Sequence, residues 1–232
     1  MKSLLTIIGS LLTSRFVRTS LVLIGCVLQA LFIKVEHDEK YVPAVILKGT
    51  ASLMFVLLGL GYRSLSGKYI FLGLLFGMIG DILLNLRFVF PKSGQKIFLI
   101  GIVAFLTGHI LYLVSLLPHA VHPLRYILIG AVVAGTLLLY IFKTMDVKPA
   151  FKIFGVFYLG AVFIMTSIAI GIAVADPSMK NIIYAVGAVL FTASDVVLIF
   201  NTFSGVTKFS LRITNLSLYY IGQILIALSL YR

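Results

Sequence analysis

Two aspartates, Asp81 and Asp195, each interrupt a run of apolar residues long enough to cross a lipid bilayer. A carboxylate at membrane depth costs at least about 2.5 to 3.5 kcal/mol, so an acid in such a position is by default a functional-site candidate. Two carboxyls in a medium of low dielectric constant do not easily both ionise, and one of them is expected to keep its proton near neutral pH. The two aspartates therefore form a candidate acid/base pair.

Four other polar side chains lie within apolar runs at depths from which they can approach the aspartates: Lys48, His109, Tyr219 and Gln223. Both aspartates lie well past the middle of odd-numbered runs, which cross the membrane in the same direction, so both belong to the same leaflet. Lys48 is near the start of an even-numbered run and reaches that leaflet from the opposite direction. The spacing predicts one polar pocket in one half of the membrane, with Lys48 and His109 as the cationic partners within the runs.

Other catalytic chemistries find less support in the residues. The sequence has neither a Gly-x-Ser-x-Gly elbow nor a Gly-Lys-Ser/Thr phosphate loop. His37, His119 and His122 lie in or beside predicted loops, and no His-Glu-x-x-His motif or cysteine cluster occurs. The one cysteine, Cys26, lies inside an apolar run, where packing is its expected role. We therefore expect neither a metal site nor another cofactor.

The composition explains where such a pocket must lie. Of 232 residues, 61% are hydrophobic and 11% charged, and the mean hydropathy is +1.15, whereas soluble domains are about half apolar and a quarter charged. A water-soluble globule is therefore excluded. The net charge of +12 would suggest nucleic acid on a soluble protein, but the basic residues fall mostly between apolar runs, so we expect lipid headgroups as the anionic partner and no nucleic acid.

A membrane helix needs roughly 20 mostly apolar residues, and eight runs meet this requirement. They are 17–33, 42–62, 69–86, 97–117, 124–142, 153–175, 182–200 and 213–231. The connections between them are short, so the sequence predicts an all-α, multi-pass membrane protein whose residues 1–232 form a single polytopic domain. In a bacterium it would lie in the inner membrane. Any chemistry must then take place on helices or tight loops, within the membrane.

The N-terminal stretch 4–13 is apolar but too short to span, so we expect a short interfacial helix there. Eight runs place both termini on one side, and Lys and Arg divide almost evenly between the two sides, so their bias does not fix the orientation. Three basic residues lie before or at the start of the first run, Lys2, Arg15 and Arg18, and three acidic residues follow it, Glu36, Asp38 and Glu39. This local asymmetry favours cytoplasmic termini.

The two halves of the chain match at a fixed offset of 114 residues, the separation of Asp81 and Asp195. The same offset relates Gly73 to Gly187, 108–111 to 222–225, and Ser115 to Ser229. Because the offset spans four helices, an even number, the pattern predicts a parallel 4+4 repeat with halves of about 17–117 and 124–231, related by an axis near the membrane normal. The two aspartates would then face each other.

At these positions the sequence resembles the YhhN-like lysoplasmalogenase family of integral membrane hydrolases. The resemblance rests on a Gly-Asp block at 80–84, a Phe-x-x-x-His-x-x-Tyr block at 105–112, a Ser-Asp block at 187–195 followed by Asn201 and Phe203, a Tyr-Tyr-x-x-Gln block at 219–223, and Lys48. It runs from Lys48 to the end and leaves the first span unmatched. Gly49-Thr50-Ala51 stands where the family usually has a proline after the lysine.

The resemblance implies hydrolysis of the vinyl ether bond of lysoplasmalogens to a fatty aldehyde and glycerophosphoethanolamine or glycerophosphocholine. A vinyl ether hydrolyses when an acid protonates the carbon β to oxygen, giving an oxocarbenium ion that water attacks. Asp81 and Asp195 would supply the acid and the base, in an order that the sequence leaves open. The lysophospholipid and water would be the only reactants.

The same resemblance implies a set of substrate-binding residues. Lys48 would hold the phosphate as a point charge, and His109, Tyr219 and Gln223 would orient water or the glycerol. The matched blocks add four more residues: Asn85, Tyr112, Ser194 and Asn201. Asn85 and Ser194 also fit a role as hydrogen-bonding groups between packed helices.

Two other functions use similar residues. An intramembrane aspartyl protease also has two aspartates, but Met78 stands where its Gly-x-Gly-Asp motif requires glycine, and Asp195 follows serine instead of tyrosine. A proton-coupled transporter of small molecules or lipids with parallel repeats could use the same Asp/Asp/Lys/His cluster as a proton relay. Aldehyde release would indicate the hydrolase, whereas flux without breakdown of the transported molecule would indicate the transporter.

Overall fold

The computed structural model describes residues 14–205 and 207–231, and this part of the chain is built of helices. Eight of these are long and apolar enough to cross a membrane, which confirms the predicted all-α class and number of spans. They are α2 (Arg15–His37), α3 (Tyr41–Gly59), α4 (Leu65–Val89), α5 (Gly94–Leu116), α6 (Pro123–Thr144), α7 (Pro149–Ala175), α8 (Met179–Phe203) and α9 (Phe209–Leu228), with the short 3-10 turns η1 (Pro91–Ser93), η2 (Leu117–His119) and η3 (Ser229–Tyr231). The predicted interfacial helix at 4–13 lies outside the described residues.

Most helix ends extend past the apolar runs because charged residues do not end a helix, although α3 and α9 end at Gly59 and Leu228, three residues before the ends predicted at 62 and 231. The third run was predicted as 69–86, whereas α4 begins at Leu65, where the Ser64 hydroxyl accepts a hydrogen bond from the Gly67 amide at 3.0 Å. At the other end α4 continues through Arg87. A scan of hydropathy ends an apolar run at the first charged residue. A residue with a long basic side chain still makes the backbone hydrogen bonds of the helix, and its charged group extends toward the membrane interface. The last turn of α4 therefore carries a charge that the sequence assigned to a loop.

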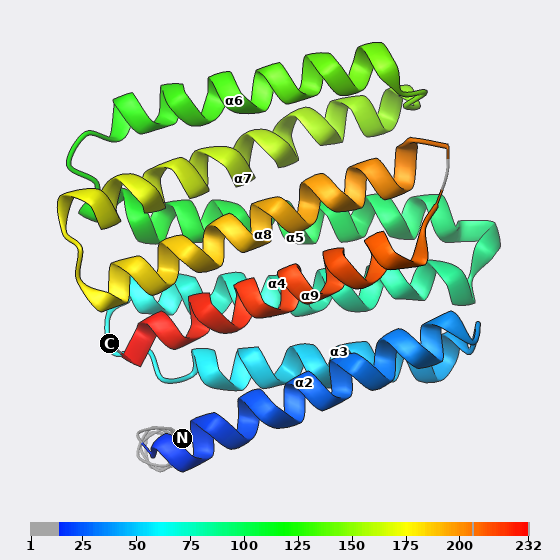
Figure 1. Cartoon of the computed structure of the whole chain (residues 1–232), viewed down its shortest axis with the longest axis horizontal. Coiled ribbons are helices and arrows are strands. Elements are labelled where there is room, and N and C mark those ends of the chain that lie inside the picture. The colour runs from blue at the N-terminus through cyan, green and yellow to red at the C-terminus, as the bar shows by residue number, and fades with distance from the viewer. Residues whose placement is uncertain (1–13, 206, 232) are drawn as a thin grey trace.

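The eight helices lie side by side and alternate in direction (Figure 1). In the middle of the bundle, α4 packs along α5 and α8 packs along α9. The pair α2 and α3 lies on one flank and the pair α6 and α7 on the other (Figure 1). Helix α2 begins and η3 ends at the same end of the bundle, the left end in Figure 1. Which membrane surface this end faces stays a prediction.

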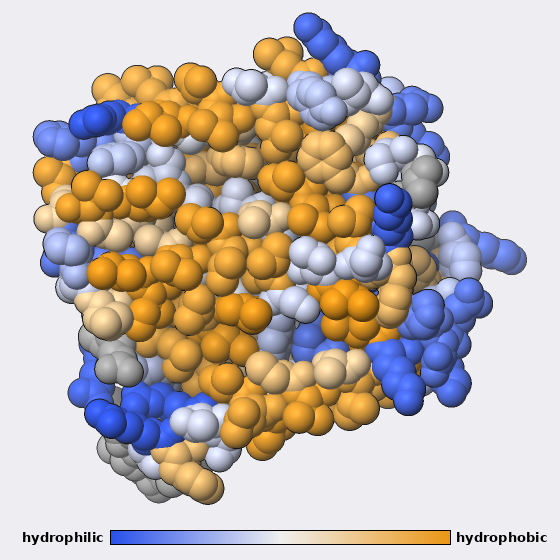
Figure 2. Space-filling model, viewed as in Figure 1, coloured by the Kyte–Doolittle hydropathy of each residue, from blue (hydrophilic) through white to orange (hydrophobic). Residues whose placement is uncertain are grey.

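The outer surface of the bundle is apolar over most of the face in Figure 2, with hydrophilic side chains gathered at the two ends. Large exposed hydrophobic residues lie on α2, α6 and α7, for example Leu23, Val132, Leu139 and Val174. Soluble proteins rarely expose apolar surface on this scale, whereas a lipid-facing surface requires it. The structure supports an integral, multi-pass membrane protein.

Glycines let the central helices cross closely, at positions that the 114-residue offset relates. A Cβ on Gly108 of α5 would lie 3.0 Å from the carbonyl oxygen of Gly73 on α4. A Cβ on Gly222 of α9 would lie 2.8 Å from the carbonyl oxygen of Gly187 on α8. Small residues at such crossings are typical of membrane helix pairs. Matched glycines thus make matched contacts in the two halves, although the duplication itself stays a prediction.

Replacing Gly222 by alanine is expected to lower the stability of the protein. The new Cβ would lie 2.8 Å from the Gly187 carbonyl oxygen and 3.0 Å from the Phe191 amide nitrogen, and neither backbone atom can rotate away. We expect a loss of about 1 to 3 kcal/mol, measured as a lower thermal unfolding midpoint in detergent. Gly135→Ala is the matched control, because a Cβ at Gly135 meets no atom within 4 Å; equal midpoints for the two variants would contradict the prediction.

Candidate active site

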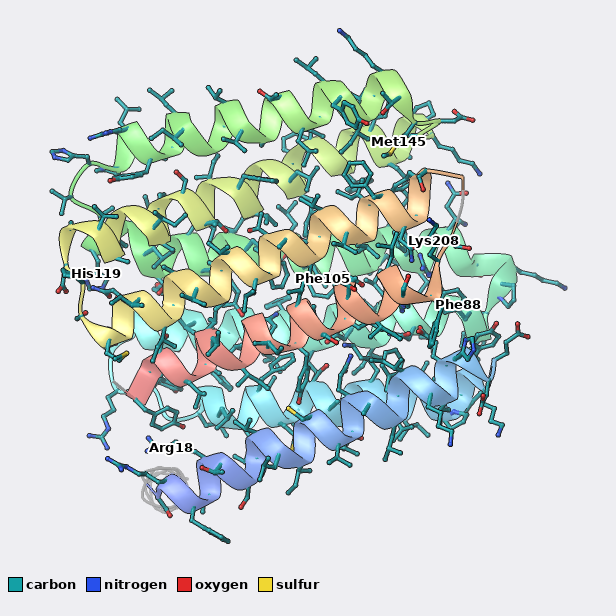
Figure 3. All side chains as sticks on the ribbon, viewed as in Figure 1. Arg18, Phe88, Phe105, His119, Met145 and Lys208 are labelled. Carbon is teal, nitrogen blue, oxygen red and sulfur yellow. The ribbon has the colours of Figure 1, made fainter. Side chains whose placement is uncertain are left out.

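Both aspartates line one cavity of about 130 Å³ inside the bundle. Phe105, labelled near the middle of the bundle in Figure 3, lines its inner part, and Val147 and Phe203, near the loops at the right-hand end, line its outer part. Its walls are mostly apolar and include the following residues of α6, α7 and α8: Leu138, Ile141, Phe142, Leu159, Leu198 and Ile199. Polar groups converge on an otherwise apolar pocket, which is the usual character of a small-molecule site.

Asp81 lies in a network of donors from two other helices. Its Oδ2 accepts hydrogen bonds from the Ser52 hydroxyl of α3 at 2.5 Å and from the Tyr219 hydroxyl of α9 at 2.7 Å. The Lys48 ammonium of α3 lies 3.5 Å from its Oδ1. The side chain is nearly buried, with 4% of its surface exposed. Two hydroxyl donors and one cation stabilise a carboxylate in its ionised form.

Lys48 is itself fully enclosed, with 1% of its surface exposed. Its ammonium donates a hydrogen bond to Gln29 Oε1 of α2 at 3.2 Å and lies 4.6 Å from the centroid of the Tyr219 ring. The Lys48 ammonium is therefore surrounded by the Asp81 carboxylate, the Gln29 amide oxygen and the Tyr219 ring. Few of its donors are accessible to a ligand.

Asp195 lies in a different environment on the same cavity. Its Oδ2 accepts one hydrogen bond, from the Tyr158 hydroxyl of α7 at 2.7 Å, and the side chain is as buried as that of Asp81. In residues 14–205 and 207–231 no cation forms an ion pair with it and no bond joins it to Asp81. The two carboxyls therefore bind separate hydroxyls and differ in the number of donors around them.

His109 packs behind Tyr158 and is absent from the lining of the cavity. Its ring lies 5.5 Å from the Tyr158 ring and 4.6 Å from the Phe191 ring, centroid to centroid. Its Nδ1 is 2.7 Å from the Phe105 carbonyl oxygen and must donate to it, since a carbonyl only accepts. The buried Nε2 has no hydrogen-bond partner among the described residues. His109 thus contacts the residue that binds Asp195 instead of the cavity.

Tyr112 and Gln223 lie behind Tyr219. The Tyr112 hydroxyl donates to Gln223 Oε1 at 2.8 Å, whereas the Tyr219 hydroxyl donates to Asp81. Neither Tyr112 nor Gln223 lines the cavity. These two predicted substrate-binding residues therefore bind each other and not the contents of the cavity.

Of the remaining predicted residues, Asn85 lies on the cavity, Ser194 lies inside α8 and Asn201 lies near the end of α8. Asn85 lines the cavity and donates from Nδ2 to the Asp81 carbonyl at 2.9 Å, while its Oδ1 has no partner among the described residues. The Ser194 hydroxyl donates to the Phe191 carbonyl within α8, and neither Ser194 nor Asn201 lines the cavity. Asn201 Oδ1 accepts from the Lys208 amide in the loop after α8, at 2.7 Å. The cavity thus collects five of the predicted residues: Lys48, Asp81, Asn85, Asp195 and Tyr219.

The YhhN family model matches residues 40–230 of this chain. The chain belongs to the YhhN family. Comparisons with curated proteins and with solved structures find no match. The matched range contains both aspartates and all but the first of the eight spans of this YhhN protein.

The sequence did not predict three hydrogen-bond partners of the charged residues in the candidate site of this YhhN protein. Ser52 lies four residues after Lys48, on the same face of a helix, a spacing that could have revealed it. Tyr158 is one of several tyrosines in the sequence and carries no comparable signal. Gln29 lies on α2, outside the range that the YhhN model matches, and only the packing of α2 against α3 brings it to Lys48.

Two arginines also line the cavity, Arg87 of α4 and Arg212 of α9. Arg212 binds Glu36 of α2 through two hydrogen bonds, from Nε to Oε2 at 3.0 Å and from Nη2 to Oε1 at 2.6 Å. Arg87 lies just after the predicted apolar run 69–86, and Arg212 lies just before the run 213–231. Both arginines are therefore predicted to lie in loops. In the structure they lie near the ends of helices that border the cavity.

Proposed function

We propose that this YhhN protein hydrolyses the vinyl ether bond of lysoplasmalogens, releasing a fatty aldehyde and a glycerophospho-headgroup such as glycerophosphoethanolamine or glycerophosphocholine. One observation carries the proposal. Two nearly buried carboxyls line the same apolar-walled cavity, and their hydrogen-bond environments differ. Carboxyl pairs whose environments differ in this way are how enzymes obtain an acid and a base from one residue type.

The difference in environment supports one assignment of the two roles. Asp81, with two hydroxyl donors and the Lys48 ammonium, is the ionised base. Asp195, with one hydroxyl donor and no ion pair in the described part of the chain, is the protonated acid. Burial favours a neutral carboxyl wherever no cation compensates for the lost water.

The reaction then proceeds in three balanced steps. Asp195 gives its proton to the β carbon of the vinyl ether, and an oxocarbenium ion forms. Water attacks the carbon attached to oxygen while Asp81 takes a proton from that water, which gives a hemiacetal. In the collapse, Asp195 accepts the hemiacetal hydroxyl proton, Asp81 returns its proton to the departing glycerol oxygen, and the C–O bond breaks. Both carboxyls end in their starting states, and one water is consumed.

The experiment that tests this function offers the purified protein matched single-chain lipids. The 1-alkenyl lysophospholipid is expected to release a fatty aldehyde, whereas 1-alkyl and 1-acyl analogues of equal chain length are expected to remain intact, because only the vinyl ether has a carbon that a carboxylic acid protonates to a stabilised cation. Aldehyde is measured by trapping with a hydrazine and mass spectrometry. Absence of aldehyde, together with flux of a lipid across proteoliposomes without its breakdown, would indicate a transporter instead.

A further inference from the structure

Three cationic side chains line the cavity: Lys48, Arg87 and Arg212. The Lys48 ammonium is bound by Asp81 and Gln29. The Arg212 guanidinium is bound by both carboxylate oxygens of Glu36. Two of the three charges are thus already matched by partners within the protein.

Arg87 differs from the other two in its partners. No carboxylate in the described part of the chain forms an ion pair with it, and its buried Nε has no hydrogen-bond partner there. The guanidinium carbon lies 4.6 Å from the centroid of the Phe88 ring and 4.4 Å from that of Phe98. These rings fix the position of the charged group but leave its buried Nε–H without an acceptor in the described part of the chain. A buried N–H of a charged group that makes no hydrogen bond is costly, which points to an acceptor supplied by a ligand.

The position of Arg87 defines where that acceptor would lie. Arg87 follows Asp81 by six residues on α4, so it is about 9 Å further along the helix axis. Helix α4 ends two residues later, at Val89. Phe88, the neighbour of Arg87, is labelled at the right-hand end of the bundle in Figure 3, well outside Phe105 in the middle. Arg87 therefore lines the cavity near the membrane surface, where lipid phosphates lie, while Asp81 lines it at greater depth.

We propose that Arg87 binds the phosphate of the substrate, a single-chain phospholipid whose glycerol extends from Arg87 inward to the aspartates. A guanidinium matches two phosphate oxygens with its paired N–H donors. This assignment moves the phosphate-binding role from Lys48, which is buried and occupied, to the one arginine of the cavity that lacks an acceptor among the described residues. It rests on the proposed function for the position of the reacting bond, and its test measures binding without turnover.

The test compares two ligands that differ only in the headgroup, 1-acyl lysophosphatidylcholine and the 1-monoacylglycerol with the same chain. Neither has a vinyl ether, so affinity is measured by titration in nanodiscs of neutral lipid without turnover. Wild type is expected to bind the phospholipid more tightly than the monoacylglycerol by about 10- to 100-fold, the usual effect of a charged hydrogen bond. Arg87→Gln is expected to lose this preference while its affinity for the monoacylglycerol is unchanged, which also shows that the cavity is intact.

Two further variants sharpen the result. Arg87→Lys, which keeps the charge but not the paired donors, is expected to retain part of the preference. Arg125→Gln is the matched control, since Arg125 is an exposed arginine of α6, at the opposite end of the bundle, and it is expected to bind as wild type does. Equal preference for the phospholipid in wild type and Arg87→Gln would overturn the proposal.

A final binding measurement distinguishes a site for a lipid phosphate from a site for any free phosphate anion. Inorganic phosphate and glycerophosphocholine are expected to bind wild type far more weakly than the lysolipid, because they lack the chain that occupies the apolar walls. Binding of inorganic phosphate as tight as that of the lysolipid would overturn the lipid assignment. If the headgroup preference depends on Arg87 but no aldehyde forms from the alkenyl lipid, the proposed reaction fails while the phosphate site stands.

Discussion

Asp195→Asn is expected to reduce aldehyde release by about 100- to 10,000-fold, the usual contribution of a positioned acid or base. An amide cannot give a proton to the β carbon, yet it can still accept the hydrogen bond that Tyr158 donates to Asp195 at 2.7 Å. The variant is therefore expected to fold and to keep its thermal stability. The measurement is single-turnover aldehyde formation from the 1-alkenyl lysophospholipid, together with the unfolding midpoint of the same preparation.

The counterpart variant, Asp81→Asn, is expected to lose activity to a similar extent but also to lose stability, because it leaves the buried Lys48 ammonium without its carboxylate. Asp176→Asn serves as a control: Asp176 is an exposed aspartate in the loop between α7 and α8, at the end of the bundle opposite to Arg87. Near-normal turnover in either cavity variant would contradict the pair mechanism.

Lys48→Met is expected to destabilise the protein by about 3 to 5 kcal/mol, the usual effect of removing one partner of a buried ion pair. Methionine fills most of the volume of the lysine stem but leaves the Asp81 carboxylate with its hydroxyl partners, Ser52 and Tyr219, and no cation. It also leaves Gln29 Oε1 without the donor that Lys48 provides. The measurement is the thermal unfolding midpoint in detergent.

The double variant Lys48→Met/Asp81→Asn isolates the ion pair from the packing. Removing both charges is expected to restore most of the stability that Lys48→Met loses, because no buried charge is left uncompensated, while activity stays absent. Lys143→Met, at an exposed lysine of α6, is the control for loss of a positive charge. The interpretation fails if the double variant is no more stable than Lys48→Met alone.

The fold could be predicted from the sequence because hydropathy alone determines which segments can cross a bilayer. Within the described residues the ends of the helices differ from the prediction, for a physical reason. Arg87 ended the third apolar run in the sequence, but it continues α4 in the structure, since a helix needs backbone hydrogen bonds and not apolar side chains. This difference of a few residues moved one arginine from a predicted loop to the lining of the cavity.

The part of the candidate site that could be predicted is the part determined by the depth of each residue in the membrane and by the direction of its helix. Asp81 and Asp195 line one cavity, as expected for two residues at equal depth on helices that run the same way. Their partners depend on rotation about each helix axis, which packing sets. Tyr158 is therefore indistinguishable from other tyrosines in the sequence, whereas the spacing of four residues from Lys48 to Ser52 is the one signal that could have revealed Ser52. Asn201 shows the converse case, since it belongs to a matching block but binds the Lys208 amide in a loop.

Helix α2 supplies partners to two of the cations that line the cavity even though the YhhN match begins at residue 40. Gln29 binds Lys48, and Glu36 binds Arg212. A chain shortened to the matched range would leave the Arg212 guanidinium without Glu36, and a second competing anion site would arise beside Arg87. Truncated versions made for biochemical work would thus be expected to bind anionic lipids less selectively, so the first span belongs in every expression design.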